Sequence, residues 1–238
     1  MGSNLAMKRI LITGAGSGIG LATASLLSSK GYHISATCRN DASRERILKT
    51  CSGQADVQIL DVRDYAAVKN WVNSVGAIDV LINNAGLGYF DPVAEGKIEQ
   101  WHEMVDVNVK GMLNCIHAAL PALTEKRGHV INIGSVASRN VFANSGIYAS
   151  TKHAVLAISE SLRLELAGKI RVSTIMPGAT NTEFIHKTDN QTLLKDYVPY
   201  FAAGLDPATI AEAILYCVES PEGTVISEIT VRPDRKII

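Results

Sequence analysis

The chain has 238 residues, and its 23 basic residues balance its 23 acidic residues to a formal net charge of zero. This length accommodates one α/β domain with a sizeable core, and the charge balance disfavours nucleic acid or an anionic membrane surface as a partner. No apolar run approaches the roughly 18 residues that a bilayer-spanning helix needs, so no membrane association is expected. The four cysteines lie far apart without the CxxC spacing of zinc or redox sites, which predicts free thiols in a reducing, cytoplasmic compartment.

Residues 1–6 come before a second methionine, Met7, which directly precedes the first expected strand. We therefore expect residues 1–6 to be a disordered lead or a vector-derived scar. The remaining residues, 7–238, contain no internal repeat, low-complexity tract or linker, and they are expected to form a single domain. The six histidines lack metal-ligand spacing such as HExxH, so no metal is expected in the chemistry.

Short apolar runs and segments of helical periodicity alternate along the chain. The expected strands are 8–13, 33–37, 57–60, 79–82, 129–133, 170–175 and 224–231. The expected helices are 21–27, 42–49, 65–75, 98–123, 147–166 and 207–218, with Pro121 distorting the long helix 98–123 near its end. Residues 179–206 are expected to be mostly irregular. The alternation predicts an α/β fold, a doubly wound parallel sheet of Rossmann type with about seven strands.

A glycine-rich turn, Gly14-Ala-Gly-Ser-Gly-Ile-Gly20, joins the first expected strand to the first helix. Backbone without side chains lets N–H groups approach a phosphate, and the N-terminus of a helix adds a positive partial charge. Such a stretch can also be a plain turn, but the flanking strand and helix supply the context that a dinucleotide site requires. The candidate phosphate-binding residues are Gly14, Gly16, Ser17, Gly18, Ile19 and Gly20.

Tyr148 and Lys152 are four residues apart, so they share one face of the expected helix 147–166. An adjacent cation lowers the pKa of a phenol, which would let Tyr148 act as a general acid or base. Ser135 follows strand 129–133 at the carboxyl edge of the sheet, where ligands bind, and it offers a second hydroxyl. The same tyrosine and lysine spacing is common on solvated helices, and Ser135 could instead cap a turn, with Ser138 as the functional hydroxyl.

These motifs, in this order and spacing, closely resemble the classical short-chain dehydrogenase/reductase family over nearly the whole chain. The resemblance rests on Thr13 to Gly20, Asp61-Val62, Asn83 to Gly86, Asn108, Ser135, Tyr148 with Lys152, and Pro177-Gly178 with Thr182. It implies that Tyr148 exchanges a proton with a carbonyl or alcohol oxygen that Ser135 holds. It also implies that Lys152 lowers the pKa of Tyr148 and hydrogen-bonds the nicotinamide ribose. The same resemblance makes Asn108 a helix-interrupting residue that positions a water in the proton relay, although an ordinary polar helix residue remains an alternative.

The resemblance also extends the cofactor site beyond the glycine turn. In the family, an aspartate like Asp61 meets the adenine, and a tetrapeptide like 83–86 lies against the cofactor and braces the sheet. Asn83 and Asn84 could otherwise be ordinary turn residues. The cofactor-binding residues implied in this way are Asp61, Val62, Asn83, Asn84, Ala85, Gly86, Tyr148, Lys152, Pro177, Gly178, Thr180 and Thr182.

The end of the second strand favours NADP(H) over NAD(H). An acidic residue there would bind the ribose 2′-hydroxyl and repel a 2′-phosphate, but this chain has Cys38 followed by Arg39. A guanidinium binds phosphate in a forked, charge-assisted arrangement. Two features leave NAD possible: Ser17 stands where many NADP-dependent relatives carry a basic residue, and Asp41 could pair with Arg39.

Residues 179–206 resemble the substrate loop of the family and carry several of the chain's few aromatic residues. Together with aromatics in neighbouring loops they predict an apolar pocket, although these rings could merely hold the loop down. The aromatic residues are Phe184, Tyr197, Tyr200 and Phe201 in the loop, and Tyr89, Phe90 and Phe142 nearby.

The function that we predict is an NADP(H)-dependent interconversion of a carbonyl and a secondary alcohol on a small apolar or hydroxy/keto substrate. A 3-oxoacyl carrier-protein reductase is the alternative within the family, and a non-catalytic dinucleotide-sensing regulator is the alternative from another class. The family usually associates through two long helices, here 98–123 and 147–166, so a homodimer or homotetramer is expected.

Overall fold

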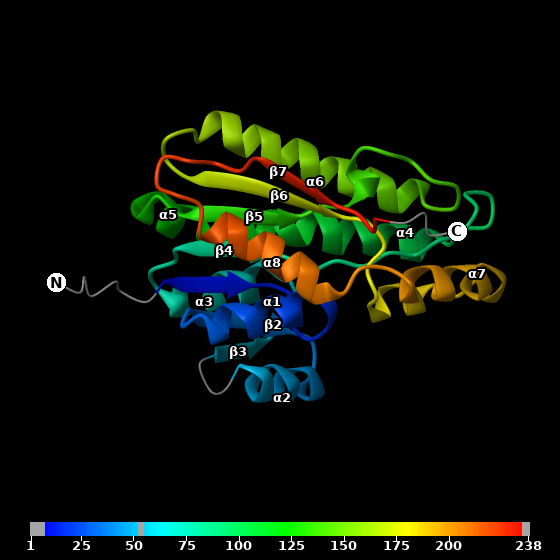
Figure 1. The fold of residues 1–238 in the computed structure, drawn as a ribbon, viewed down its shortest axis with the longest axis horizontal. Helices are drawn as coiled ribbons and strands as arrows, with labels where there is room; N and C mark the ends of the chain where they lie inside the picture. The colour runs from blue at the N-terminus through cyan, green and yellow to red at the C-terminus, as the bar shows by residue number, and fades with distance from the viewer. Residues whose placement is uncertain (1–7, 52–54, 235–238) are drawn as a thin grey trace.

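A seven-stranded parallel sheet forms the centre of the computed structural model, which describes residues 8–51 and 55–234. The strand order is β3-β2-β1-β4-β5-β6-β7, so the chain winds outward from β1 in both directions (Figure 1). This confirms the predicted doubly wound fold. The expected lead at 1–6 lies outside the described residues. The strands are β1 (Arg9–Ile12), β2 (His33–Cys38), β3 (Ala55–Ile59), β4 (Val80–Asn83), β5 (His129–Ile133), β6 (Arg171–Pro177) and β7 (Glu228–Val231).

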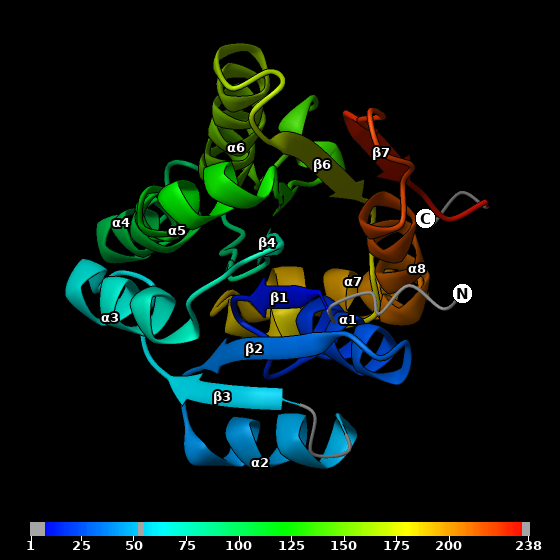
Figure 2. The same ribbon diagram turned by 90° about the vertical axis from the view of Figure 1, so that its left-hand side faces the viewer.

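Helices cover both faces of the sheet, and successive strand residues point to opposite helical layers. Ile10 and Ile12 pack with α1, α2 and α8, whereas Leu11 between them packs with α3, α5 and α6. Figure 2 shows these two layers on either side of the strands. Burial on both faces explains why the strands read as continuous apolar runs. The helices are α1 (Gly18–Ser29), α2 (Asp41–Thr50), α3 (Tyr65–Val75), α4 (Ile98–Val105), α5 (Met112–Lys126), α6 (Gly146–Glu165), α7 (Gln191–Ala202) and α8 (Pro207–Val218).

The expected long helix 98–123 is interrupted at a different place from the one predicted. A π-helical segment, Asp106–Gly111, separates α4 from α5, whereas Pro121 lies inside α5 and the helix continues to Lys126. Burial of Ala119 and Leu123 on either side of Pro121 holds that part of the helix against the sheet. Packing therefore outweighs the lost backbone donor of the proline.

Residues 179–206 are more regular than predicted. They contain a 3-10 helix, η3 (Glu183–Lys187), and the helix α7. The side chain of Asn190 accepts hydrogen bonds from the amides of Thr192 and Leu193 at 3.1 Å, which caps α7. A proline in this segment argued against a helix in the sequence, but Pro199 lies inside α7 and does not end it. Within the described ranges, no helix is both long and apolar enough to cross a membrane.

Candidate active site

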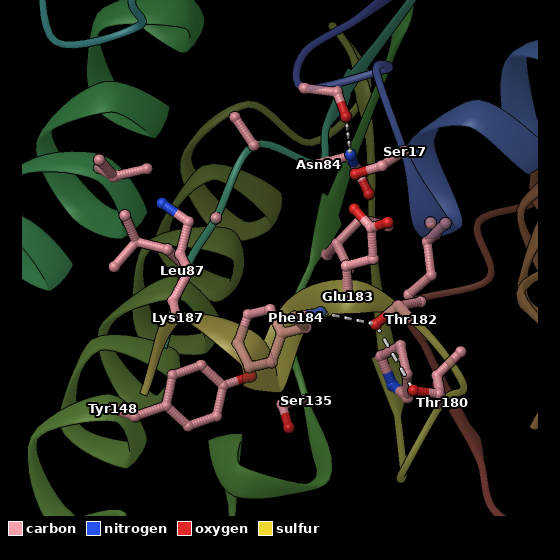
Figure 3. A pocket seen from close by; sticks show the side chains of 18 of the residues that line it. Ser17, Asn84, Leu87, Ser135, Tyr148, Thr180, Thr182, Glu183, Phe184 and Lys187 are labelled. Atoms are coloured by element: carbon pink, nitrogen blue, oxygen red, sulfur yellow. Dashed lines mark hydrogen bonds between the residues drawn. The ribbon is translucent and has the colours of Figure 1, made fainter. Parts of the chain in front are cut away.

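A cavity of about 1070 Å³ opens at the carboxyl ends of the strands, where ligands bind in doubly wound sheets. It runs from the glycine turn after β1 to the hydroxyl groups of Ser135 and Tyr148 (Figure 3). Three predicted site residues, Gly20, Asn83 and Asn108, do not line it. The predicted residues that do line it are Gly14, Gly16, Ser17, Gly18, Ile19, Arg39, Asp61, Val62, Asn84, Ala85, Gly86, Ser135, Tyr148, Lys152, Pro177, Gly178, Thr180 and Thr182.

The glycine turn brings bare backbone to the wall of the cavity. Gly14 has a φ of +66°, and a Cβ there would meet the Ala85 Cα at 2.8 Å. A Cβ on Gly16 would meet the Ser43 Cβ at 2.7 Å. Ser17 begins α1 without a side-chain cap, so its side chain leaves the first amides of the helix to another acceptor. The turn therefore fits a phosphate-bearing ligand.

Gly20, Asn83 at the end of β4 and Asn84 directly after it support the wall of the cavity. A Cβ on Gly20 would lie 2.4 Å from the Asn84 Nδ2. Asn84 donates through Nδ2 to the carbonyls of Thr13 and Gly14, both at 3.0 Å. Asn83 donates to the Asn132 Oδ1 at 2.8 Å and thereby joins β4 to β5. In the tetrapeptide 83–86, the two asparagines connect neighbouring segments of the sheet edge by hydrogen bonds. Asn84, Ala85 and Gly86 line the cavity.

Ser135 and Tyr148 bring two hydroxyl groups to the same end of the cavity. The side chains of Ser135 and Tyr148 both line the cavity and lie near each other in Figure 3. Ser138 does not line the cavity, because its hydroxyl accepts the Ser135 amide at 3.1 Å within a capping box. The Ser135 hydroxyl takes part in the same turn, because its Oγ accepts the Ala137 amide at 3.1 Å, so Ser135 caps a turn and lines the cavity as well.

Burial controls the protonation of the tyrosine and the lysine. Tyr148 is buried, which raises its pKa to about 12, while the hydrogen bond from Ser135 acts in the opposite direction. Lys152 is also buried, which lowers its pKa to about 8, and its Nζ donates to the Ile133 carbonyl at 2.8 Å. Desolvation of the phenol is the larger influence and Lys152 is not among the causes of this shift, so the lowering of the Tyr148 pKa by Lys152 stays a prediction.

Asn108 lies in the π-helical segment, at the helix interruption that the resemblance implied. Its Oδ1 accepts the Leu87 amide at 2.8 Å, and its Nδ2 donates to the Leu87 carbonyl at 2.8 Å and to the Thr151 Oγ1 at 3.0 Å. The amide group is buried and its donors are fully used by these protein groups. In this structure Asn108 therefore positions the loop after β4 against α6.

Arg46, on the helix that follows β2, is a cation near the glycine turn that the sequence analysis missed. Arg39 is exposed and lines the cavity, and Arg46 also lines it while donating to the Gly16 carbonyl at 3.0 Å. Ser43 and Arg46 are three residues apart on α2, so this helical spacing was a signal that could have placed both beside the glycine turn. Asp41 makes no ion pair with Arg39 in the residues that the structure covers.

Asp61 lines the cavity and forms a local ion pair. Arg63 Nη2 donates to its Oδ2 at 2.6 Å, and this hydrogen bonding lowers the pKa of Asp61. The carboxylate is therefore charged at neutral pH and already neutralised by its neighbour.

Aromatic side chains wall the end of the cavity next to Tyr148. The ring centroid of Phe90 lies 5.4 Å from that of Tyr148, 5.7 Å from that of Tyr197 and 6.2 Å from that of Phe201. Phe184 contacts the Tyr148 ring at a centroid distance of 5.5 Å. Of the seven predicted aromatics, only Tyr89 does not line the cavity, among the residues that are described. Two acidic lining residues, Glu183 and Asp196, are exposed, and Figure 3 shows the Glu183 side chain beside Ser17.

A doubly wound sheet with a glycine turn at one end of a cavity and a buried tyrosine and lysine at the other is the architecture of a dinucleotide-binding oxidoreductase. The model of the short chain dehydrogenase family matches residues 8–193. The chain belongs to this family.

Proteins of known sequence and structure resemble the chain over almost its full length. An uncharacterized oxidoreductase of Staphylococcus saprophyticus is 37% identical and covers 97% of this chain and 98% of its own. The closed form of serine dehydrogenase complexed with NADP+ superposes with a TM-score of 0.87 at 32% identity, covering 94% of each chain. An alcohol dehydrogenase from the archaeon Thermococcus sibiricus, complexed with 5-hydroxy-NADP, has a TM-score of 0.83 at 30% identity and covers 95% of this chain and 96% of its own.

Proposed function

We propose that the protein is an NADP(H)-dependent oxidoreductase that interconverts a carbonyl compound and its alcohol. The observation that carries this proposal is one continuous cavity with the glycine turn along one part and the hydroxyls of Ser135 and Tyr148 at another. Bound cofactor would supply the hydride, so the chain must hold the substrate oxygen and move one proton.

The proposed proton donor is Tyr148. In reduction, its hydroxyl gives a proton to the carbonyl oxygen as that oxygen gains electrons, and in oxidation the alcohol proton returns by the same path. Ser135 holds the oxygen by a hydrogen bond, and Lys152, which is anchored on Ile133, hydrogen-bonds the ribose. The raised pKa of Tyr148 keeps the phenol protonated at neutral pH, which is the form that donates a proton in reduction.

NADP(H) is the proposed cofactor because the adenosine side of the cavity is basic. Arg39 and Arg46 line it, and no acidic residue ends β2. Two arginines provide charge-assisted donors for a 2′-phosphate, whereas a 2′-hydroxyl would leave them without an anion. The NADP complexes of serine dehydrogenase and of the archaeal alcohol dehydrogenase support the same choice.

The proposed substrate is a small, largely apolar ketone or aldehyde. Phe90, Phe184 and Tyr197 supply an apolar wall beside Tyr148, and Asp196, which is next to Tyr197 in the sequence, is exposed. Such a wall excludes water and binds hydrocarbon, while Ser135 and Tyr148 recognise the single polar oxygen.

The test is a screen of NADPH oxidation with ketones, aldehydes, quinones and oxoacyl thioesters. We expect turnover with apolar carbonyl compounds and a kcat/KM that is higher with NADPH than with NADH. Tyr148→Phe should reduce kcat by about 10²-fold to 10⁴-fold while leaving NADPH binding intact. Tyr216→Phe is the matched control, because Tyr216 is exposed on α8. Turnover that survives Tyr148→Phe would remove the tyrosine from the proton transfer.

We also propose that the chain forms a homodimer or homotetramer. Ile98, Val105 and Leu113 expose apolar side chains along the segment from α4 to α5, and Leu164 does so on α6. Large exposed apolar side chains on these helices are typical of a subunit interface. Light scattering on the eluting protein measures the mass, and a monomer at micromolar concentration would refute this proposal.

A further inference from the structure

Lys187 is a cation on the substrate loop that faces the cofactor part of the cavity. It is the last residue of η3, lines the cavity and is half-buried. In Figure 3 its side chain extends along one wall of the cavity, across from Ser17. Because an ammonium group is strongly hydrated, half-burial of Lys187 costs free energy that an anion in the cavity would offset.

The three residues after Lys187 tie this part of the loop to the segment between β4 and α4. The Thr188 Oγ1 accepts the Phe90 amide at 3.2 Å, and Thr188 is buried. Lys97 donates to the Asp189 Oδ2 at 2.8 Å, and Asn190 donates to the Asp91 Oδ1 at 3.0 Å. These hydrogen bonds therefore hold the backbone next to Lys187 in place beside the cavity.

The charged groups near Lys187 are Arg39, Arg63 and the Glu103 carboxylate, and among the described residues none of them forms an ion pair with it. Arg39 and Arg63 lie close enough to disfavour its charged form, although burial is the larger cause of its lowered pKa. The Glu103 carboxylate accepts the Tyr89 hydroxyl at 2.6 Å, and the Asp61 carboxylate is paired with Arg63. Among the described residues, neither Lys187 nor Arg39 has a hydrogen bond or an ion pair from its side chain.

We propose that Lys187 and Arg39 together bind the 2′-phosphate of NADP(H), so that the substrate loop itself takes part in choosing the cofactor. This inference rests on the proposed function. Two cations that line one cavity without partners repel each other, and a dianionic phosphate between them removes that repulsion.

The 2′-phosphate fits this position better than the pyrophosphate does. The pyrophosphate of a dinucleotide is held at the glycine turn by backbone amides, on the side of Ser17. Two of the charged neighbours of Lys187, Arg39 and Arg63, follow β2 and β3, and the third is Glu103. The end of β2 is where the adenosine ribose lies in this fold.

Calorimetric titration with 2′,5′-ADP, ADP, NADPH and NADH tests the proposal without requiring turnover. Lys187→Gln should weaken binding of 2′,5′-ADP and NADPH by about tenfold and leave ADP and NADH within about twofold. Lys195→Gln is the matched control, because Lys195 lies on the same loop but is exposed and does not line the cavity. Lys187→Arg should retain most of the affinity for 2′,5′-ADP, because it keeps the charge.

Each outcome decides the inference. In the double variant with Arg39→Gln, the two losses should be non-additive for 2′,5′-ADP, because one phosphate couples both side chains. Equal loss for ADP and 2′,5′-ADP would assign Lys187 to the pyrophosphate and overturn the proposal, as would no loss for either ligand. If the wild-type chain bound neither NADPH nor NADH, the proposed function itself would fail, which is a distinct result.

Discussion

Lys152 donates from Nζ to the backbone carbonyl of Ile133 at 2.8 Å, so the amine of α6 is anchored at the end of β5. This anchor places the amine 5.9 Å from the centre of the Tyr148 ring, inside a buried part of the cavity. The amine is thereby oriented before any ligand binds. The cost is desolvation, which lowers the pKa of Lys152 from 10.5 to about 8.

This shift predicts a pH dependence of stability. Between about pH 8 and 10.5 the unfolded chain holds the Lys152 proton while the folded chain has released it, so this group makes the free energy of unfolding rise with pH. Tyr148 acts in the opposite sense between pH 10 and about 12, because its folded pKa is raised. The wild type should therefore gain roughly 2 to 3 kcal/mol of unfolding free energy relative to Lys152→Met between pH 7 and pH 10.

Urea unfolding of the wild type and of Lys152→Met at both pH values measures this difference. The comparison removes the contribution of buried thiols such as Cys115, whose pKa burial raises to about 12 in both proteins. A difference in unfolding free energy that does not change with pH would show that Lys152 titrates normally.

Asn108→Ala should destabilise the protein by about 2 to 4 kcal/mol, because the buried amide and carbonyl of Leu87 both lose their partner. Asn114→Ala is the matched control on α5, where the half-buried side chain donates to the Val62 carbonyl at 2.9 Å. Its expected cost is about 1 kcal/mol. Urea unfolding measures both costs, and equal costs would contradict the positioning role of Asn108. If Asn108 also orders a water in the proton relay, kcat falls at saturating NADPH.

Arg46→Ala should weaken NADPH binding by about three- to tenfold through loss of a cation beside the glycine turn. Arg39→Ala should have an effect of similar or greater size, with NADH less affected in both variants. Arg44→Ala serves as the control, since Arg44 is an exposed residue of α2 that does not line the cavity. Fluorescence titration measures the dissociation constants. Identical losses of NADPH affinity in the Arg44 and Arg46 variants would show that the overall surface charge, rather than a contact of Arg46, causes the loss.

Thr188→Val should loosen the substrate loop, because the buried amide of Phe90 loses its acceptor. We expect faster hydrogen exchange over 183–202 and a higher KM for the carbonyl substrate, with a stability loss of about 1 to 3 kcal/mol. Thr188→Ser keeps the hydroxyl and should restore slow exchange. If the serine variant exchanged as fast as the valine variant, packing of the threonine methyl rather than its hydrogen bond would hold the loop.

Much of the site was predictable because its residues lie at the ends of strands or one helical turn apart. In a parallel sheet the carboxyl ends of the strands meet at one edge, so the turn at Gly14 and the hydroxyl of Ser135 had to converge. The spacing of Tyr148 and Lys152 placed them on the same face of α6. Local spacing and chain alternation carry this information without any knowledge of packing.

The remaining features depend on contacts between distant segments. The helix α7 forms where Tyr197 and Phe201 pack on Phe90, and the π-helical segment lets Asn108 reach Leu87. These interactions join residues that are far apart in the sequence, so no local pattern reports them.

The amino-acid sequence by itself determined the doubly wound fold, the family and most of the residues that line the cavity at the edge of the sheet, because periodicity and motif order are local properties of the chain. Only the tertiary structure decided that burial raises the pKa of Tyr148, that Arg46 joins the glycine turn and that Lys187 is held over the cavity. Desolvation and long-range hydrogen bonds depend on which segments pack together, and that packing exists only in the folded chain.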